Sequence, residues 1–166
     1  MVEVQLAAVR VDLQSNTPVV LLQEMQGAKR TLPIFIGPPE ATAIAFAIQG
    51  VPVKRPMTHD LMRDLLEVLD ASVEQVVITE LVATTYHAEL RLVTGGRHLT
   101  VQSRPSDAIA LAARTGTPLF VADDLLDSEG VVLASEGDEE ETPNPEELLG
   151  EFQKFLDEVK PEDFSS

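Results

Sequence analysis

Two short segments of the chain combine an arginine, a small hydroxyl residue and an aspartate within a few positions. The first is Arg55-Pro56-Met57-Thr58-His59-Asp60, and the second is Arg104-Pro105-Ser106-Asp107. Guanidinium groups bind phosphate, and carboxylate oxygens bind hard cations such as Mg²⁺ or Mn²⁺. If the two segments lie together in the fold, they pair two carboxylates with two arginines. Such a group is suited to binding and cleaving a phosphodiester.

Each segment is expected to start a helix, and so is a third segment that begins Gly37-Pro38-Pro39-Glu40. Thr58 is the expected N-cap of its helix, and proline suits the first turn of the other two. Each helix then carries an acidic residue in its first turn, where carboxylates are stabilised by free backbone N–H groups and the helix dipole. These carboxylates therefore have a structural interpretation beside the functional one.

The functional interpretation assigns a role to each polar residue of these helix starts. Histidine is the residue type that most often exchanges protons near neutral pH, so His59 is a candidate base or metal ligand. The candidate catalytic residues are thus Asp107, Asp60 and His59. The candidate phosphate contacts are Arg104 and Arg55, and the candidate ligands for Mg²⁺ or Mn²⁺ are Asp107, Asp60 and Glu40.

Composition excludes several other classes of protein. The 166 residues include no cysteine, so disulfides and cysteine-ligated zinc sites are impossible. The longest apolar run, residues 43–48, is far too short to span a membrane, and residues 1–6 alternate like a strand rather than a signal peptide. We therefore expect a cytoplasmic protein without membrane association. With only 4% aromatic residues, a stacking platform for single strands is not expected.

The acidic character of the chain is concentrated at its C-terminal end. The net charge is −16, but residues 1–122 carry a net charge of only −2 and residues 123–166 carry −14. A nearly neutral body can present a local basic patch, so the overall charge does not exclude a nucleic-acid partner.

Alternating and helical patterns predict an α+β fold: a single compact domain with a mixed, largely antiparallel sheet packed by three main helices. Val2 to Leu13 reads as a long strand with a bulge, and residues 41–48 as an alanine-rich helix buried on nearly every side. A Gly95-Gly96 turn would pair Glu89 with Gln102 and His87 with Arg104. Further strands are expected near 19–22, 32–36 and 73–82, and a helix with an apolar stripe formed by Leu61, Met62, Leu65, Leu66 and Leu69.

The last part of the chain is expected to be an acidic linker followed by an amphipathic helix. Residues 135–142 contain five acidic side chains without apolar periodicity. Asn144-Pro145 then resembles a helix start, followed by an apolar stripe at Leu149, Phe152, Leu156 and Val159. This helix would pack on its own domain, on a second subunit or on a partner.

Three motifs together resemble the bifunctional nuclease domain family. They are residues 33–44 (PIFIGPPEATAI), residues 55–61 (RPMTHDL) and residues 104–112 (RPSDAIALA), in the family's order and with similar spacing. The resemblance divides the chain into a nuclease-like domain over 1–125 and the acidic linker with its C-terminal helix over 126–166. One position departs from the family pattern: Gln102 stands where an aspartate is common, and an amide binds a hard divalent cation less well than a carboxylate.

The resemblance implies a compact α+β domain that is often a homo-oligomer, and a metal-dependent nuclease acting on RNA or DNA. The residues that match family motifs are Glu40, Arg55, Thr58, His59, Asp60, Arg104, Ser106 and Asp107. A second hypothesis uses the same residues differently. In a non-catalytic regulatory or assembly domain, the arginines and aspartates would form ion pairs that lock helix starts or a subunit interface.

Overall fold

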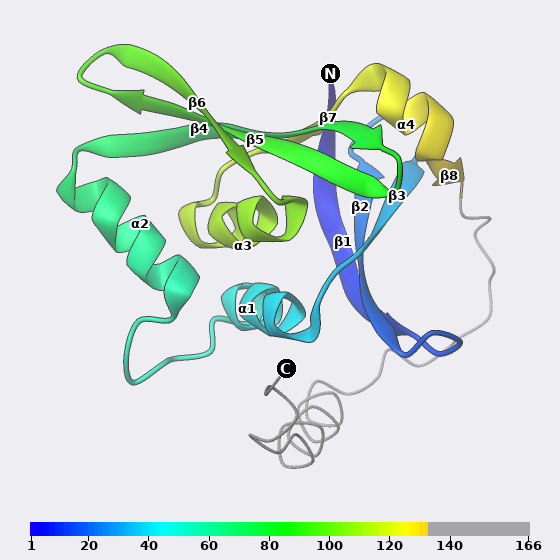
Figure 1. The fold of residues 1–166 in the computed structure, drawn as a ribbon, viewed down its shortest axis with the longest axis horizontal. Helices are drawn as coiled ribbons and strands as arrows, with labels where there is room; N and C mark the ends of the chain where they lie inside the picture. Colours follow the sequence, from blue (N-terminus) through cyan, green and yellow to red (C-terminus); the bar gives the residue numbers. More distant parts are fainter. Residues whose placement is uncertain (133–166) are drawn as a thin grey trace. The chain divides into compact units, whose positions relative to one another are not determined.

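The computed structural model describes residues 1–132, which form a mixed sheet and four helices (Figure 1). The strands are β1 (Val2–Asp12), β2 (Thr17–Glu24), β3 (Arg30–Phe35), β4 (Ala71–Val82), β5 (Thr85–Thr94), β6 (Arg97–Ser103), β7 (Leu119–Val121) and β8 (Val131–Val132). The helices are α1 (Pro38–Gln49), α2 (Thr58–Val68), α3 (Pro105–Thr115) and α4 (Asp123–Glu129). The predicted α+β class is therefore confirmed.

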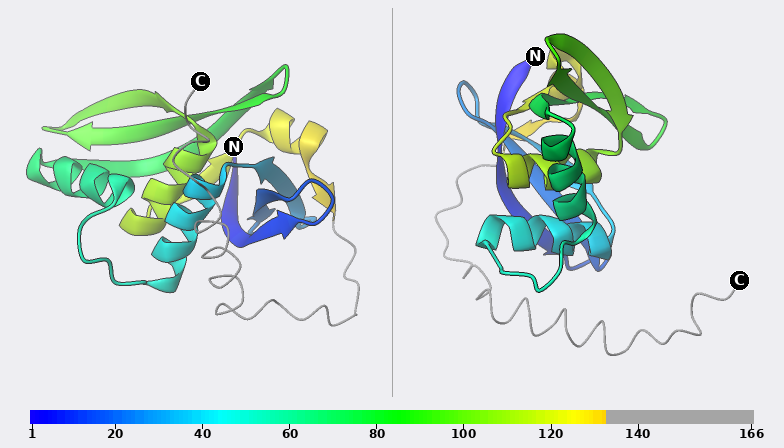
Figure 2. Two further views of the ribbon diagram at one scale, coloured as in Figure 1. Left: turned by 60° about the horizontal axis from the view of Figure 1, so that its bottom comes forward. Right: turned by 90° about the vertical axis from the view of Figure 1, so that its left-hand side faces the viewer.

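All eight strands belong to one sheet in the order β6-β5-β4-β7-β1-β2-β3-β8. Neighbouring strands are antiparallel except β4 and β7, which are parallel. The chain passes from β4 through β5, β6 and α3 before β7 pairs alongside β4. The prediction of a mixed, largely antiparallel sheet is thus confirmed. Figure 1 shows β1–β3 crossing the direction of β4–β6, so the sheet curves around the helices. Figure 2 (left) shows α1, α2 and α3 along one side of β4–β6.

Two local sheet predictions are confirmed. The register between β1 and β2 shifts between Leu6 and Ala8, which is the bulge expected from the change of alternation. Glu89 pairs with Gln102 across the β5–β6 hairpin, and the Gln102 amide donates a hydrogen bond of 3.0 Å to the Glu89 carboxylate. The predicted pairing of His87 with Arg104 is wrong, because the ladder ends at Ala88 and Ser103 and Arg104 already occupies the N-cap position of α3.

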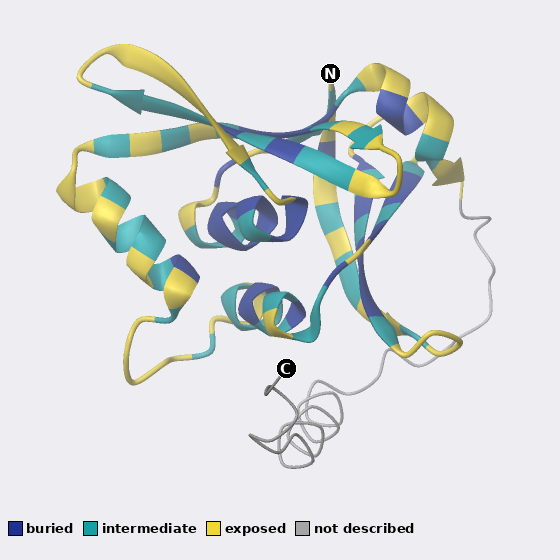
Figure 3. Cartoon of the chain, viewed as in Figure 1, coloured by how far each residue is buried: buried dark blue, intermediate teal, exposed yellow. Residues whose placement is uncertain are grey.

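The central helix is α3. Most of its first two turns are buried between α1, α2 and the sheet, as the dark blue ribbon of Figure 3 shows. The expectation that α1 is buried on nearly every side is wrong, because this helix lies at the edge of the helical layer. Ala41, Ala43 and Ile44 of α1 are buried, whereas Ile48 is 55% exposed.

The predicted apolar stripe of α2 divides into two parts. Met62 and Leu66 pack against the core. Leu61, Leu65 and Leu69 are more than half exposed, since α2 contacts α3 along only one narrow side. The prediction of Thr58 as the N-cap is wrong by one residue, because Met57 occupies that position with an extended backbone.

Residues 123–132 fold with the rest of the sheet. The short helix α4 packs against β3, and β8 pairs with Arg30 and Thr31. The folded body thus includes residues 126–132, which the sequence analysis grouped with the acidic tail. The expected linker and amphipathic helix lie outside the described residues. None of the helices within residues 1–132 has the length and apolar character needed to cross a bilayer.

Candidate active site

The start of α3 places an arginine between two carboxylates. Arg104 caps the helix, and its Nε donates to Asp107 Oδ2 at 2.8 Å while its Nη2 donates to Asp107 Oδ1 at 3.2 Å. The same Nη2 lies 3.1 Å from Glu40 Oε1 at the start of α1. The Arg104 side chain is 67% exposed, and those of Glu40 and Asp107 are 19% and 26% exposed. The starts of two helices therefore meet around one solvent-accessible guanidinium.

Glycine at position 37 allows the Glu40 carboxylate to fold back toward the start of its own helix. A Cβ atom at residue 37 would collide with Glu40 Oε2. Pro38 and Pro39 occupy the first helical turn, where the missing N–H groups are no loss. The sequence Gly37-Pro38-Pro39-Glu40 thus holds Glu40 close to the helix end and within reach of Arg104.

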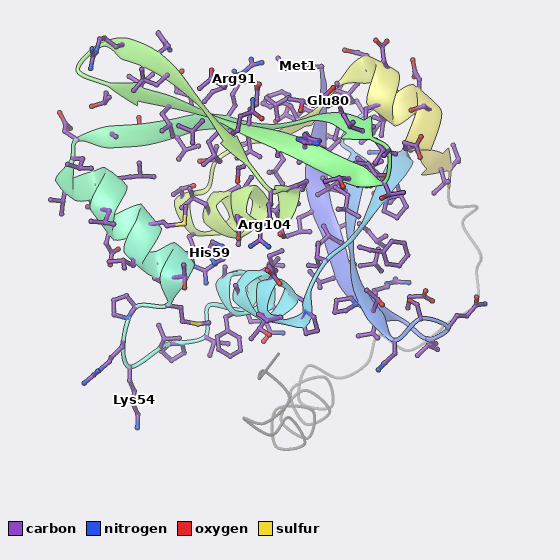
Figure 4. The ribbon with its side chains drawn as sticks, in the orientation of Figure 1. Met1, Lys54, His59, Glu80, Arg91 and Arg104 are labelled. Atoms are coloured by element: carbon purple, nitrogen blue, oxygen red, sulfur yellow. The ribbon has the colours of Figure 1, made fainter. Side chains whose placement is uncertain are left out.

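The start of α2 contributes His59 to the same cluster. His59 is only 6% exposed, and its Nε2 lies 3.0 Å from Asp107 Oδ1. Its Nδ1 is buried without a hydrogen-bond partner. Since an ionised Asp107 can only accept, His59 Nε2 is the donor in this hydrogen bond. Figure 4 shows His59 and Arg104 on the same side of the domain, beside α1.

These contacts keep Asp107 ionised. Burial acts to raise the pKa of Asp107, but the hydrogen bonds from Arg104 and His59 outweigh it, so the pKa lies below its ordinary value. The hydrogen bond that Arg104 donates to Asp107 in turn raises the pKa of Arg104. At neutral pH the cluster of Glu40, His59, Arg104 and Asp107, which we call the Arg104 cluster, therefore presents a charged carboxylate and a charged guanidinium to solvent.

Asp60 is directed toward a different partner. Arg114, in the last turn of α3, donates from Nε to Asp60 Oδ1 at 2.5 Å, and these side chains are 4% and 14% exposed. Arg114 Nη1 also donates to the carbonyl oxygens of Ala43 in α1 and Ala110 in α3. Burial acts to raise the pKa of Asp60, but the hydrogen bond from Arg114 and a second from the Met57 N–H hold it below its ordinary value.

The structure thus brings together some of the sequence-predicted residues and separates others. Glu40, His59, Arg104 and Asp107 meet in one cluster, and Asp60 binds Arg114. Arg55 lies exposed in the loop before α2 and forms no salt bridge within residues 1–132. The adjacent Lys54 projects outward from this loop (Figure 4).

Sequence reasoning missed two features of the region. Arg114 gave no signal beyond a basic residue near the end of a helix, and its partner Asp60 is 54 residues away in the sequence. A pocket of about 320 Å³ also adjoins the Arg104 cluster, between the β4–β5 turn and the starts of α1 and α3. Its lining includes Tyr86, the one tyrosine of the chain.

The donor set of the Arg104 cluster can be compared with the needs of a divalent cation. Glu40 and Asp107 already converge on one positive charge, the guanidinium. Proteins commonly bind Mg²⁺ through one or two carboxylates, with water and substrate phosphate completing the shell. Glu40 and Asp107 fit this requirement if Arg104 moves aside. Within residues 1–132, no three Asp, Glu or His side chains gather closely enough to ligate one ion.

The fold and the cluster define an α+β domain in which two partly buried carboxylates meet an exposed arginine at adjoining helix starts. The chain belongs to the bifunctional nuclease domain family, whose model matches residues 20–134. This confirms the resemblance carried by the three motifs.

Relatives fall into two groups. An uncharacterized protein of Mycobacterium tuberculosis (strain H37Rv) is 42% identical over 99% of this chain and 98% of its own length. Bifunctional nuclease 2 of Oryza sativa subsp. japonica is 30% identical over 69% of this chain, and Bifunctional nuclease 2 of Arabidopsis thaliana is 28% identical over 78%. The matches span only 36% and 41% of these two plant proteins.

Proposed function

We propose that this chain is a divalent-metal-dependent nuclease that cleaves phosphodiester bonds in RNA or DNA. The observation that carries the proposal is the exposed guanidinium of Arg104 between two carboxylates from different helix starts, Glu40 and Asp107. Membership of the bifunctional nuclease domain family supports the reaction class.

Arg104 is the proposed phosphate contact. Its side chain is mostly exposed, so it can turn from the carboxylates toward a bound phosphate without any change in the packing of the core. A guanidinium can donate two parallel hydrogen bonds to phosphate oxygens. Arg55, on the exposed loop before α2, is the proposed contact for a neighbouring phosphate.

Glu40 and Asp107 are the proposed ligands of Mg²⁺ or Mn²⁺ when Arg104 has turned to the substrate. Such an ion would neutralise developing charge on the phosphoryl oxygens and lower the pKa of bound water. Asp107 is ionised at neutral pH, so it can bind a cation.

The geometry supports other roles for His59 and Asp60 than those the sequence suggested. The His59 Nε2–H is occupied by Asp107 and its Nδ1 is buried, which favours a positioning role over that of a base acting on substrate. The bond between Asp60 and Arg114 favours a structural role for that carboxylate over metal ligation.

A non-catalytic assembly or regulatory domain is the second candidate function. The observation in its favour is the buried Arg114–Asp60 pair, which together with the bond to Ala43 ties α1, α2 and α3 to one another. In this account the Arg104 cluster serves the same purpose at the other end of α3.

The homo-oligomeric state and the cytoplasmic location also remain predictions.

A cleavage assay separates the two candidates. The full chain is incubated with single-stranded RNA and DNA in Mg²⁺ or Mn²⁺ and then with excess chelator. A nuclease cleaves, and chelator stops it. Because Arg104 is proposed to bind substrate phosphate, Arg104→Ala should raise KM about tenfold or more. Arg97→Ala, at the exposed β5–β6 turn, removes the same charge and should have little effect. Absence of cleavage with every metal would favour the assembly domain.

A further inference from the structure

The pocket beside the Arg104 cluster differs in chemistry from the cluster itself. Glu40 and Arg104 are the charged residues of its lining. The remainder is lined by apolar and hydroxyl-bearing residues of the β3 end, the β4–β5 turn and the start of α3, including Ile34, Thr84, Tyr86 and Ser106. A pocket that combines a guanidinium with a largely uncharged lining suits a ligand with an anionic group and a flat, partly apolar body.

Tyr86 is directed to the helical side of the sheet. It lies two residues before Ala88 and four before Leu90, both buried, so alternation along β5 places the three side chains on the same face. Burial raises the pKa of Tyr86, so its phenol is neutral at physiological pH. An uncharged aromatic ring therefore lines the pocket next to the guanidinium.

Hydroxyl groups provide the uncharged polar contacts of the pocket. Ser106 is 7% exposed, and within residues 1–132 its hydroxyl forms no hydrogen bond. Thr84, in the turn between β4 and β5, and Thr85, at the start of β5, also line the pocket and are exposed. Hydroxyls both donate and accept, so they can bind the edges of a nucleobase or the oxygens of a ribose.

We propose that this pocket binds the nucleobase of the nucleotide whose phosphate contacts Arg104, with the ring of Tyr86 stacking on the base. The inference rests on the proposed nuclease function and assigns its substrate subsite. Stacking on one aromatic ring changes affinity by about tenfold or more per base and tolerates different bases. A base that is paired within a duplex cannot enter the pocket, so the subsite selects unpaired nucleotides.

The composition of the chain provides a direct probe. Tyr86 is the one tyrosine, and the chain contains no tryptophan, so tyrosine fluorescence reports on this pocket alone. The full chain is titrated with uridine 5′-monophosphate and, separately, with inorganic phosphate, without divalent metal. We expect the nucleotide to quench the fluorescence and to bind at least about tenfold more tightly than phosphate, as stacking predicts. Equal affinities would overturn the proposal.

Two substitutions test the ring itself, with calorimetry as the readout. Tyr86→Leu keeps apolar bulk but removes the aromatic ring, so nucleotide affinity should fall to that of phosphate while phosphate affinity stays unchanged. Tyr86→Phe keeps the ring and should bind nucleotide like the wild type. If Tyr86→Leu retains the full nucleotide affinity, the base does not stack on this residue and the proposal fails.

This outcome is separable from that of the nuclease proposal. Uridine 5′-monophosphate has no internucleotide bond, so its binding does not depend on cleavage. Tight nucleotide binding without cleavage of any polymer would contradict the nuclease proposal and support the nucleobase pocket. Cleavage of single-stranded RNA with the same kcat/KM in Tyr86→Leu and wild type would contradict the nucleobase pocket and support the nuclease proposal.

Discussion

Two arginines at opposite ends of α3, Arg104 and Arg114, differ in their environment although both bind carboxylates. Arg104 is 67% exposed and can exchange its partners for a ligand, whereas Arg114 is 4% exposed and donates to a carboxylate and two carbonyl oxygens. The guanidinium that is free to move belongs to the proposed site, and the one that is enclosed holds the helices together. Residue type alone does not separate these roles, because burial decides them.

Arg114→Leu is expected to destabilise the protein. The substitution leaves the Asp60 carboxylate largely buried without its partner, and breaking such a pair lowers the free energy of unfolding by about 3 kcal/mol. The double variant Asp60→Asn/Arg114→Leu removes the unpaired charge and should be less destabilised than Arg114→Leu alone. Urea unfolding of both variants measures this, and a double variant that is the less stable of the two would contradict the structural role.

Loss of the His59 hydrogen bond is expected to change the pH dependence of cleavage. This bond lowers the pKa of Asp107, so His59→Ala should raise that pKa and move the acid limb of the kcat/KM profile to higher pH. His59→Gln can still donate to Asp107 and should largely keep the wild-type profile. An unchanged acid limb in His59→Ala, with activity lost uniformly at all pH values, would indicate a different role.

At the scale of elements, the site depends on three helix starts that meet around α3. The sequence predicts each helix start, since proline, glycine and acidic residues are local signals. It also predicts the Glu89–Gln102 register, because two glycines define the hairpin turn. It does not predict that Asp60 meets Arg114, because this contact depends on how α2 crosses α3.

The pocket could not be predicted for the same reason. Its lining comes from β3, the β4–β5 turn and two helix starts, which only the curvature of the sheet brings together. The low aromatic content argued against base stacking, but composition says nothing about where one tyrosine lies. Local patterns therefore specify the elements, and long-range packing specifies which of their residues share a site.

The two sides of α2 should respond differently to truncation. Leu66 packs against the core, whereas Leu65 is 51% exposed. Leu66→Ala should lower the free energy of unfolding by about 1–2 kcal/mol, and Leu65→Ala by less than about 0.5 kcal/mol. Urea unfolding compares them directly. An equal loss in both variants would show that Leu65 is also covered in solution, as in the expected homo-oligomer.

At the scale of the whole molecule, several carboxylates carry charges that the fold stabilises. Beside Asp60 and Asp107, Glu24 is 3% exposed and accepts hydrogen bonds from the Arg30 side chain and backbone. The side-chain bond from Arg30 is the main cause that lowers the pKa of Glu24. These ionised groups link β2 to β3 and α2 to α3, so the stability of the body depends on their charge.

The protein is therefore expected to lose stability in acid. Each of these carboxylates has a pKa below its ordinary value, 4.5 for Glu and 3.8 for Asp, so its contribution is complete above that value. The contribution is lost as the pH falls through the lower, folded-state pKa. The urea midpoint should change little between pH 7 and 5 and fall below about pH 4.5. Glu24→Gln should show a flatter acid dependence, and a wild-type midpoint unchanged down to pH 3 would contradict this account.

The measurement that tests the central claim most directly is the cleavage rate of Asp107→Asn on single-stranded RNA in Mn²⁺. Asparagine keeps the size of the side chain but removes the charge that would bind a cation or accept a proton. With the variant confirmed as folded by its thermal unfolding midpoint, kcat/KM should fall at least about 100-fold. A folded Asp107→Asn that cleaves as fast as the wild type would show that the Arg104 cluster is not the active site.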